Sequence, residues 1–109
     1  MASTYKVLAQ SAPSATTNTD VYTVGSGKSA VVSTITVCNR AASAATYRIA
    51  IRVAGATLAN EDYITYDSAL PANDTIALTL GVTLAATDVV TIYASSANLS
   101  FNLFGAEIA

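Results

Sequence analysis

The stretch from Thr75 to Leu84 constrains the fold more than any other part of the chain. Its sequence, TIALTLGVTL, places Ile, Leu or Val at every second position and Thr, Ala or Gly between them. Successive side chains of a β-strand point to opposite faces, so a period of two indicates a strand with one buried face. The face that packs on the core is expected to carry Ile76, Leu78, Leu80, Val82 and Leu84.

A second β-rich stretch spans Val21–Arg40 and predicts a β-hairpin. Gly25 and Gly27 surround Ser26 and can adopt the positive φ angles of a tight turn, while Val, Ile, Thr and Tyr dominate both flanks. The second strand is expected over Ser29–Asn39, with core side chains from Val31, Val32, Ile35 and Val37.

The segment Thr46–Val53 also alternates. One face is expected to hold Arg48 and Arg52, with Ala50 between them, and this face suits solvent or an acidic partner surface. The opposite face is expected to point inward with Tyr47, Ile49, Ile51 and Val53.

The remaining pattern is one of short strands separated by turn residues, with no convincing helical period over ten residues. It predicts an all-β fold, an antiparallel β-sandwich of about eight strands forming one domain over residues 1–109. The strand count favours a jelly-roll-like arrangement over an immunoglobulin-like one, and the strand order stays open. Further strands are expected over residues 5–9, 20–24, 63–66, 89–95 and 99–108, and a loop or single helical turn over 54–62.

The chain is short of charge. Hydrophobic residues make up 52% and charged residues 11%, against roughly 25% charged residues in an ordinary soluble domain. A free monomer normally covers itself with mixed charges, so a surface of Ala, Ser and Thr indicates that much of it faces other protein. We expect an assembly subunit, and the alternative is an Ala- and Thr-rich monomer kept soluble by its hydroxyl groups.

Charge and hydropathy also exclude some partners. A net charge of −2 gives no basic surface for a phosphate backbone, so nucleic-acid binding is not expected. No apolar run approaches the ~20 residues of a membrane helix, and no basic region followed by an apolar run marks a secretory signal, so we expect cytoplasmic synthesis and no membrane partner.

Residues that could carry catalysis are few. Histidine is absent, which removes the usual general base and metal ligand, and Cys38 is the single cysteine, expected to be buried. The segment from Gly25 to Ser29, GSGKS, is similar to the end of a phosphate-binding loop, but Tyr22 stands where its first glycine belongs and strand residues follow in place of a helix. We therefore expect no enzyme activity and no nucleotide or other cofactor.

Carboxylates are the remaining candidates for an acid–base pair or a calcium site. Their spacing matches no ligand loop, and two of them lie where turns favour Asp, so structural roles are expected and no metal site is predicted. These residues are Glu61, Asp62, Asp67, Asp74 and Asp88.

Two tyrosines are candidates for contact with a partner. Tyr63 and Tyr66 flank a short strand beside acidic residues, and aromatic rings next to carboxylates can hold a sugar or a partner loop; the alternative is ordinary packing at a strand edge. With Arg48 and Arg52 they form the predicted set of partner-contact residues.

Two segments, TVGSGKSAVVSTITVCNR and LPANDTIALTLGVTLAATDVVTIYASSANLSFNLFGAEI, resemble small β-rich structural proteins of tailed bacteriophages, cyanophages among them. The specific elements are the turn and strand over residues 27–39, the PANDT turn at 71–75 and the run over 94–105. The resemblance implies a non-enzymatic virion protein, often a homotrimer, with no catalytic residues. It further implies either a capsid cement or decoration subunit in contact with a major capsid protein, or a tail or baseplate module that binds a host receptor or glycan.

Overall fold

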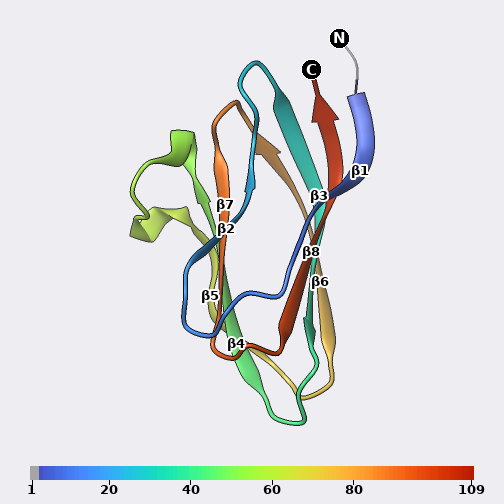
Figure 1. The fold of residues 1–109 in the computed structure, drawn as a ribbon, viewed down its shortest axis with the longest axis vertical. Coiled ribbons are helices and arrows are strands. Elements are labelled where there is room, and N and C mark those ends of the chain that lie inside the picture. The colour runs from blue at the N-terminus through green and yellow to red at the C-terminus, as the bar shows by residue number, and fades with distance from the viewer. Residues whose placement is uncertain (1–2) are drawn as a thin grey trace.

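The computed structural model describes residues 3–109, which fold into eight strands in two layers (Figure 1). Two short 3-10 turns interrupt the chain between the fourth and fifth strands: η1 (Val53–Gly55) and η2 (Asn60–Asp62). The strands are β1 (Ser3–Ser11), β2 (Thr19–Thr23), β3 (Ser29–Asn39), β4 (Ala45–Arg52), β5 (Tyr63–Leu70), β6 (Thr75–Leu84), β7 (Val89–Ala94) and β8 (Leu99–Ile108).

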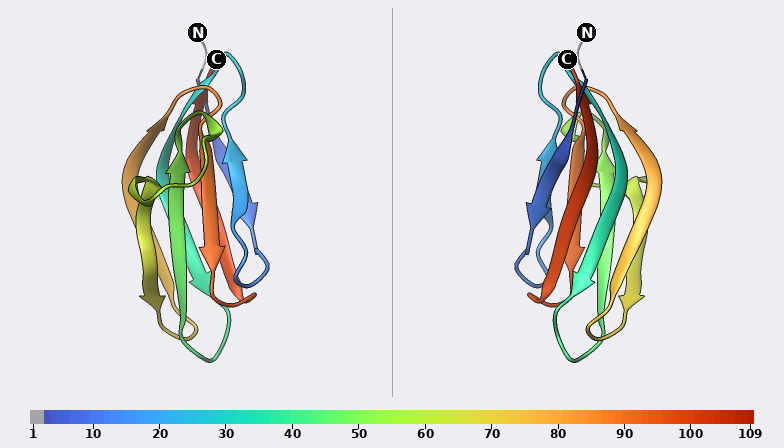
Figure 2. Two further views of the ribbon diagram at one scale, coloured as in Figure 1. Left: turned by 90° about the vertical axis from the view of Figure 1, so that its left-hand side faces the viewer. Right: turned by 90° about the vertical axis from the view of Figure 1, so that its right-hand side faces the viewer.

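The strands form two four-stranded antiparallel sheets. Sheet A has the order β1-β8-β3-β6 and sheet B the order β2-β7-β4-β5. The chain crosses between the sheets after every strand except β4, which pairs with β5 in the same sheet. This is the strand order of a jelly roll, so the predicted all-β sandwich is confirmed and the jelly-roll-like alternative is the one adopted. Figure 2 shows sheet B on the left and sheet A on the right.

The core fills the space between the two inner faces. Full burial of one large apolar side chain contributes roughly 1.5–3 kcal/mol, so this layer is the main source of stability. The inward-facing side chains of β3, β4 and β8 supply most of the core. The largest fully buried side chains of the core include Ile35, Val37, Tyr47, Ile49, Phe101 and Leu103.

The predicted hairpin over Val21–Arg40 is wrong, because β2 and β3 lie in different sheets. The turn itself is present: Gly27 has φ +75°, and the amide of Lys28 donates to the carbonyl of Gly25 at 3.2 Å. Val24 does not pair back onto β3. Its amide donates to Asp88 and its carbonyl accepts from Thr87, so the end of β2 is joined to the 85–88 turn of sheet B.

The uninterrupted alternation predicted for β6 is wrong at its centre. Gly81 has φ +63°, and the register against β3 shifts between the pairs formed by Val82 and Thr79. This irregularity leaves Leu80 47% exposed, whereas Leu84 is buried and Ile76, Leu78 and Val82 are partly buried against the core.

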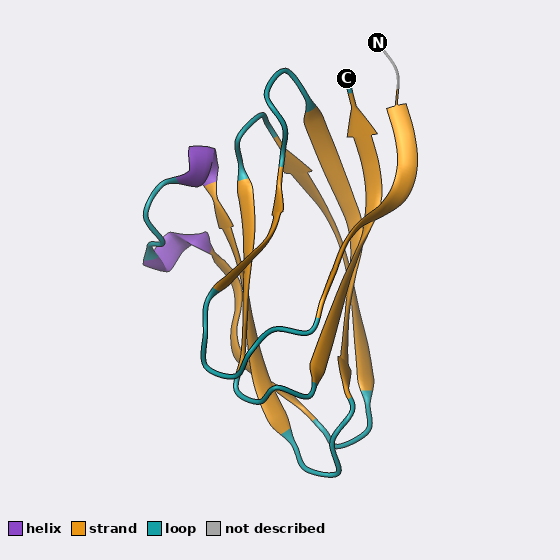
Figure 3. Ribbon diagram, in the orientation of Figure 1, coloured by secondary structure: helices purple, strands orange, loops and turns teal. Residues whose placement is uncertain are grey.

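Two further core predictions are wrong. Val31 is only half-buried, because Val32 faces the core and alternation places its neighbour on the outer side of sheet A. Val53 is 67% exposed, because β4 ends at Arg52 and Ala54, with φ +54°, turns the chain outward into η1. The loop or single helical turn predicted over residues 54–62 is a surface excursion with two short 3-10 turns, η1 and η2, and in Figure 3 both turns stand outside the sandwich.

Candidate partner-binding surfaces

The outer face of sheet B carries an aromatic cluster around one arginine. Arg48 Nε donates to Asp67 Oδ1 at 2.6 Å, and Nη2 donates to Oδ2 at 3.3 Å. The guanidinium carbon lies 4.2 Å from the ring centroid of Tyr66 and 4.1 Å from that of Tyr93, within the range of cation–π attraction. The rings of Tyr63 and Tyr66 meet edge to face at 4.9 Å. We call these five residues the Arg48 cluster.

Strand register explains how this cluster forms. Arg48 lies directly opposite Tyr93 on β7, so both side chains share one face of the sheet. On the other side, the pairing of β4 with β5 shifts around Ile49, and Asp67 adopts φ +50° at this irregularity. The bulge allows neighbouring side chains of β5 to reach the same arginine.

A partner that binds the Arg48 cluster would contact aromatic rings, because the charge of Arg48 is already paired with Asp67. The hydrogen bond with Asp67 raises the pKa of the Arg48 guanidinium above its ordinary value, so Arg48 stays protonated at neutral pH. A hollow beside it is lined by Asn60, Tyr63 and Tyr66, and the Tyr66 side chain is 56% exposed. An amide beside two phenol rings can both stack on and hydrogen-bond a ligand.

Arg52 belongs to a separate ion pair. Its Nη2 lies 3.5 Å from Asp20 Oδ2, and the other oxygen of Asp20 accepts from Thr91 Oγ1 at 2.9 Å. The structure therefore brings Arg48, Tyr63 and Tyr66 together and leaves Arg52 apart. Each arginine already faces a carboxylate of its own chain.

The outer face of sheet A carries no charged side chain among residues 3–109. The four strands of this sheet contain two charged residues, Lys6 and Glu107. They form an ion pair of 2.7 Å, and Glu107 Oε2 accepts from the hydroxyl of Tyr22 in sheet B at 2.6 Å, so this pair lies on the inner side. What remains outside is Thr, Ser, Ala, amide and apolar side chains.

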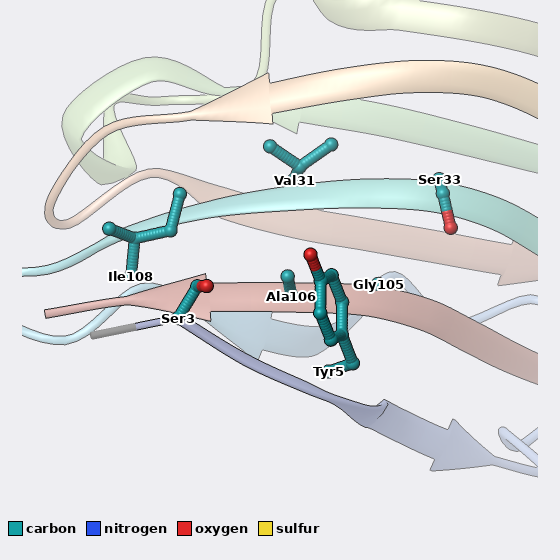
Figure 4. A pocket seen from close by; sticks show the side chains of 7 residues that line it. All are labelled: Ser3, Tyr5, Val31, Ser33, Gly105, Ala106 and Ile108. Carbon is teal, nitrogen blue, oxygen red and sulfur yellow. The ribbon is translucent and has the colours of Figure 1, made fainter.

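An apolar hollow lies in this uncharged face (Figure 4). Tyr5 is 85% exposed at the hollow and Val7, further along β1, is 47% exposed. Gly105 contributes no side chain because a Cβ there would come within 1.9 Å of the carbonyl oxygen of Val31. The hollow is lined by Ser3, Tyr5, Val31, Ser33, Gly105, Ala106 and Ile108.

Glu107 is a junction between the two sheets. Ion pairing with Lys6 and the hydrogen bond from Tyr22 lower the pKa of Glu107 below its ordinary value. Burial and the same hydrogen bond raise the pKa of Tyr22, which therefore stays a neutral donor. These groups join β1 and β8 of sheet A to β2 of sheet B.

The carboxylates considered for catalysis or calcium mostly hold turns. Asp88 is 8% exposed and accepts from the amides of Ala54 and Ala85, while Asp62 accepts from Ala59. Asp74 accepts from Thr75, and Glu61 is exposed. Within residues 3–109, no three His, Cys, Asp or Glu side chains are placed to hold a metal ion.

Two other sequence predictions concern single segments. Ser29 begins β3, so the GSGKS segment opens a strand as expected from its flanking residues. Cys38 is half-buried, not buried as expected, because its side of β3 pairs with Ser100 and Thr75 on the outer face of sheet A.

Sequence reasoning did not find Asp20, Tyr93 or Glu107. Asp20 lies 32 positions from its partner Arg52, and Tyr93 lies 45 positions from its partner Arg48. Glu107 lies 85 positions from its partner Tyr22. No local pattern marks such a residue, and only the sheet register brings it to its partner.

Comparison with known protein families and with curated proteins found no match to this chain. No helix within residues 3–109 has the length and apolar character to cross a membrane.

Proposed function

We propose that this protein is a non-enzymatic structural subunit of a bacteriophage virion, a capsid cement or decoration protein that stabilises the particle by bridging neighbouring subunits. The observation that carries the proposal is the outer face of sheet A, which within residues 3–109 has no charged side chain and exposes Tyr5 and Val7 around an apolar hollow. The partner that binds this face is the capsid shell, which presents a flat, uncharged surface at a junction between its subunits.

The physical argument concerns the cost of covering this face. Desolvating a charge is expensive, whereas covering apolar groups contributes roughly 25 cal/mol per Å² before the costs of association. Hydroxyl and amide groups there can re-form hydrogen bonds with a partner. Many copies that each bind weakly then stabilise a shell together through multivalency.

Two sequence properties support the same proposal. Only 11% of the residues are charged and histidine is absent, which fits a subunit that works through contact area. The resemblance to small phage structural proteins suggests the virion as the assembly in which this subunit makes such contacts.

The proposal is tested with phage particles that lack the protein. Purified protein is added back, and bound copies and the temperature of genome release are measured. We expect wild type to bind and raise the release temperature, and Tyr5→Asp combined with Val7→Asp to do neither. The control Tyr66→Ala, which changes the opposite sheet, is expected to behave as wild type. Equal binding by the sheet A variant would contradict the proposal.

The Arg48 cluster favours a second candidate, a tail or baseplate accessory module that binds a host receptor or glycan. Its support is the hollow lined by Asn60, Tyr63 and Tyr66 next to a fixed arginine. Labelled protein would then bind host cells, and Tyr63→Ala with Tyr66→Ala would remove the binding while Tyr5→Asp would not. Absence of binding to host cells and to their isolated surface glycans would count against it.

A further inference from the structure

The four edge strands of the sandwich differ in how they are protected. An edge strand exposes unpaired backbone N–H and C=O groups, and natural proteins guard it with charges, prolines, bulges or short length. β2 is five residues long and carries Asp20; β1 carries Lys6, and β5 carries Asp67 at its irregularity. β6, with ten residues, contains neither a charge nor a proline.

The free side of β6 is open. Within residues 3–109, β6 is hydrogen-bonded only to β3, and it forms the margin of sheet A (Figure 2, right). Thr75, Ala77 and Thr79 are all exposed on its outer face. The excursion over residues 53–62 stands on the outer side of the other sheet and does not cover this margin (Figure 1).

The first half of β6 is self-complementary. Its sequence TIALT, read antiparallel against itself, places Thr75 opposite Thr79, Ile76 opposite Leu78 and Ala77 opposite Ala77. Threonine pairs would then form on the outer face and aliphatic pairs on the half-buried inner face, and both kinds stabilise antiparallel strands.

We propose that two copies of this chain pair through residues 75–79 of β6, antiparallel and about a two-fold axis at Ala77. The pairing joins two copies of sheet A into one continuous eight-stranded sheet. Asp74, which lies just before the paired segment, then comes opposite Leu80 of the second copy, so no two carboxylates meet. The inference does not depend on the virion location proposed above.

The bulge at Gly81 sets the length of this interface. Positive φ at Gly81 and the register shift beside it break the regular strand after Thr79, so the ladder ends there. A two-fold contact uses the same edge of both copies and closes on itself. β6 therefore supports a pair and does not extend into a fibre or a ring.

A disulfide at the axis tests the geometry. In the full chain with Cys38→Ser, Ala77→Cys places two cysteines directly opposite each other, at a Cα separation of about 4.5–5.5 Å, which lies within the range that a disulfide spans. The matched control, Thr83→Cys, lies on the same face of β6 beyond the bulge. We expect Ala77→Cys to give a covalent dimer under mild oxidation and Thr83→Cys to form no disulfide between the two copies. Equal cross-linking of both variants would overturn the register.

Sedimentation equilibrium tests the association without a cysteine. Wild type is expected as a dimer of twice the 11.1 kDa chain mass. Ala77→Lys places two positive charges opposite each other and is expected to raise the dissociation constant at least about tenfold, whereas Thr83→Lys leaves it unchanged. A wild-type monomer at high concentration, or the trimer that the phage resemblance implies, would overturn this pairing.

Discussion

Single charged residues in this protein act mainly on partners that are distant in the sequence. Arg48 is held by Asp67 and by the rings of Tyr66 and Tyr93, and Glu107 joins Lys6 to Tyr22. The alternation of β4 was enough to predict that Arg48 and Arg52 face outward. Their carboxylate partners could not be predicted, because pairing depends on which strands become neighbours.

The ion pair of Glu107 is expected to make the thermal stability of the protein depend on pH in the acid range. Its pKa in the folded protein lies below the ordinary value of 4.5, so its stabilising contribution is present above that pH and is lost as the pH falls through the folded value. We expect Glu107→Gln to lower the unfolding temperature at neutral pH and the difference from wild type to vanish in acid. Thermal unfolding followed by circular dichroism measures this. Glu61→Gln, an exposed loop carboxylate, is the control and should not change the profile.

Gly105 predicts a steric effect within sheet A. A Cβ at this position would lie 1.9 Å from the carbonyl oxygen of Val31, which is backbone and cannot swing away. Gly105→Ala should therefore destabilise the fold by about 1–3 kcal/mol, the usual cost of overpacking. Gly25→Ala is the control, since its nearest neighbour is the flexible Lys28 side chain at 3.5 Å. Urea unfolding curves that coincide for wild type and Gly105→Ala would show that the close approach does not matter.

At the scale of elements, the strands were predicted better than their partners. The bounds of β3, β6 and β8 match the predicted ones, because hydrophobic period and turn residues are local signals. The partner of β2 was wrong. A glycine turn favours a hairpin locally, but burial of both sheets' inner faces makes β2 pair with β7 and β3 with β8.

The bulge in β6 was missed for a related reason. Alternation in the sequence continues through Leu80, and nothing in the residue pattern alone shows that Gly81 takes a positive φ. The deviation arises where β6 meets the irregular part of β3, between Val32 and Thr34.

The side chain of Asp88 joins two connecting segments by hydrogen bonds, so its removal is expected to destabilise the fold. It accepts hydrogen bonds from Ala54 at 2.8 Å and Ala85 at 2.9 Å, so it joins η1 to the turn before β7. Asp88→Ala leaves two amides without this partner and is expected to lower the free energy of unfolding by about 1–3 kcal/mol. Asp74→Ala removes one exposed bond and should cost clearly less. Chemical denaturation of the two variants compares these costs, and equal losses would contradict the difference in burial.

On the scale of the whole molecule, charge is divided unequally between the two sheets. All four charged residues of the strands of sheet B take part in ion pairs on its outer face, whereas the two of sheet A face inward. The low charge content of the sequence predicted a surface that meets other protein. It could not predict which face has no charged side chain, because that depends on the order in which the strands are arranged in the two sheets.

The molecule therefore has two different outer faces and one long edge strand, β6, that contains no charge and no proline. The proposed capsid contact uses sheet A, the alternative receptor contact uses the Arg48 cluster on sheet B, and the proposed self-association uses β6. The apolar hollow of sheet A is lined by β1, β3 and β8 and shares no residue with the Arg48 cluster or with residues 75–79 of β6, so each set of variants tests different residues.

The location of the protein in intact phage particles tests the proposed function most directly. Protein labelled at a position outside all three surfaces, such as the exposed Asn18 between β1 and β2 changed to Cys in the Cys38→Ser background, is assembled into particles and imaged by electron microscopy with gold. A cement or decoration protein predicts gold spread over the capsid shell. Gold confined to the tail tip would contradict that proposal and favour the receptor-binding alternative, and particles without gold would contradict both.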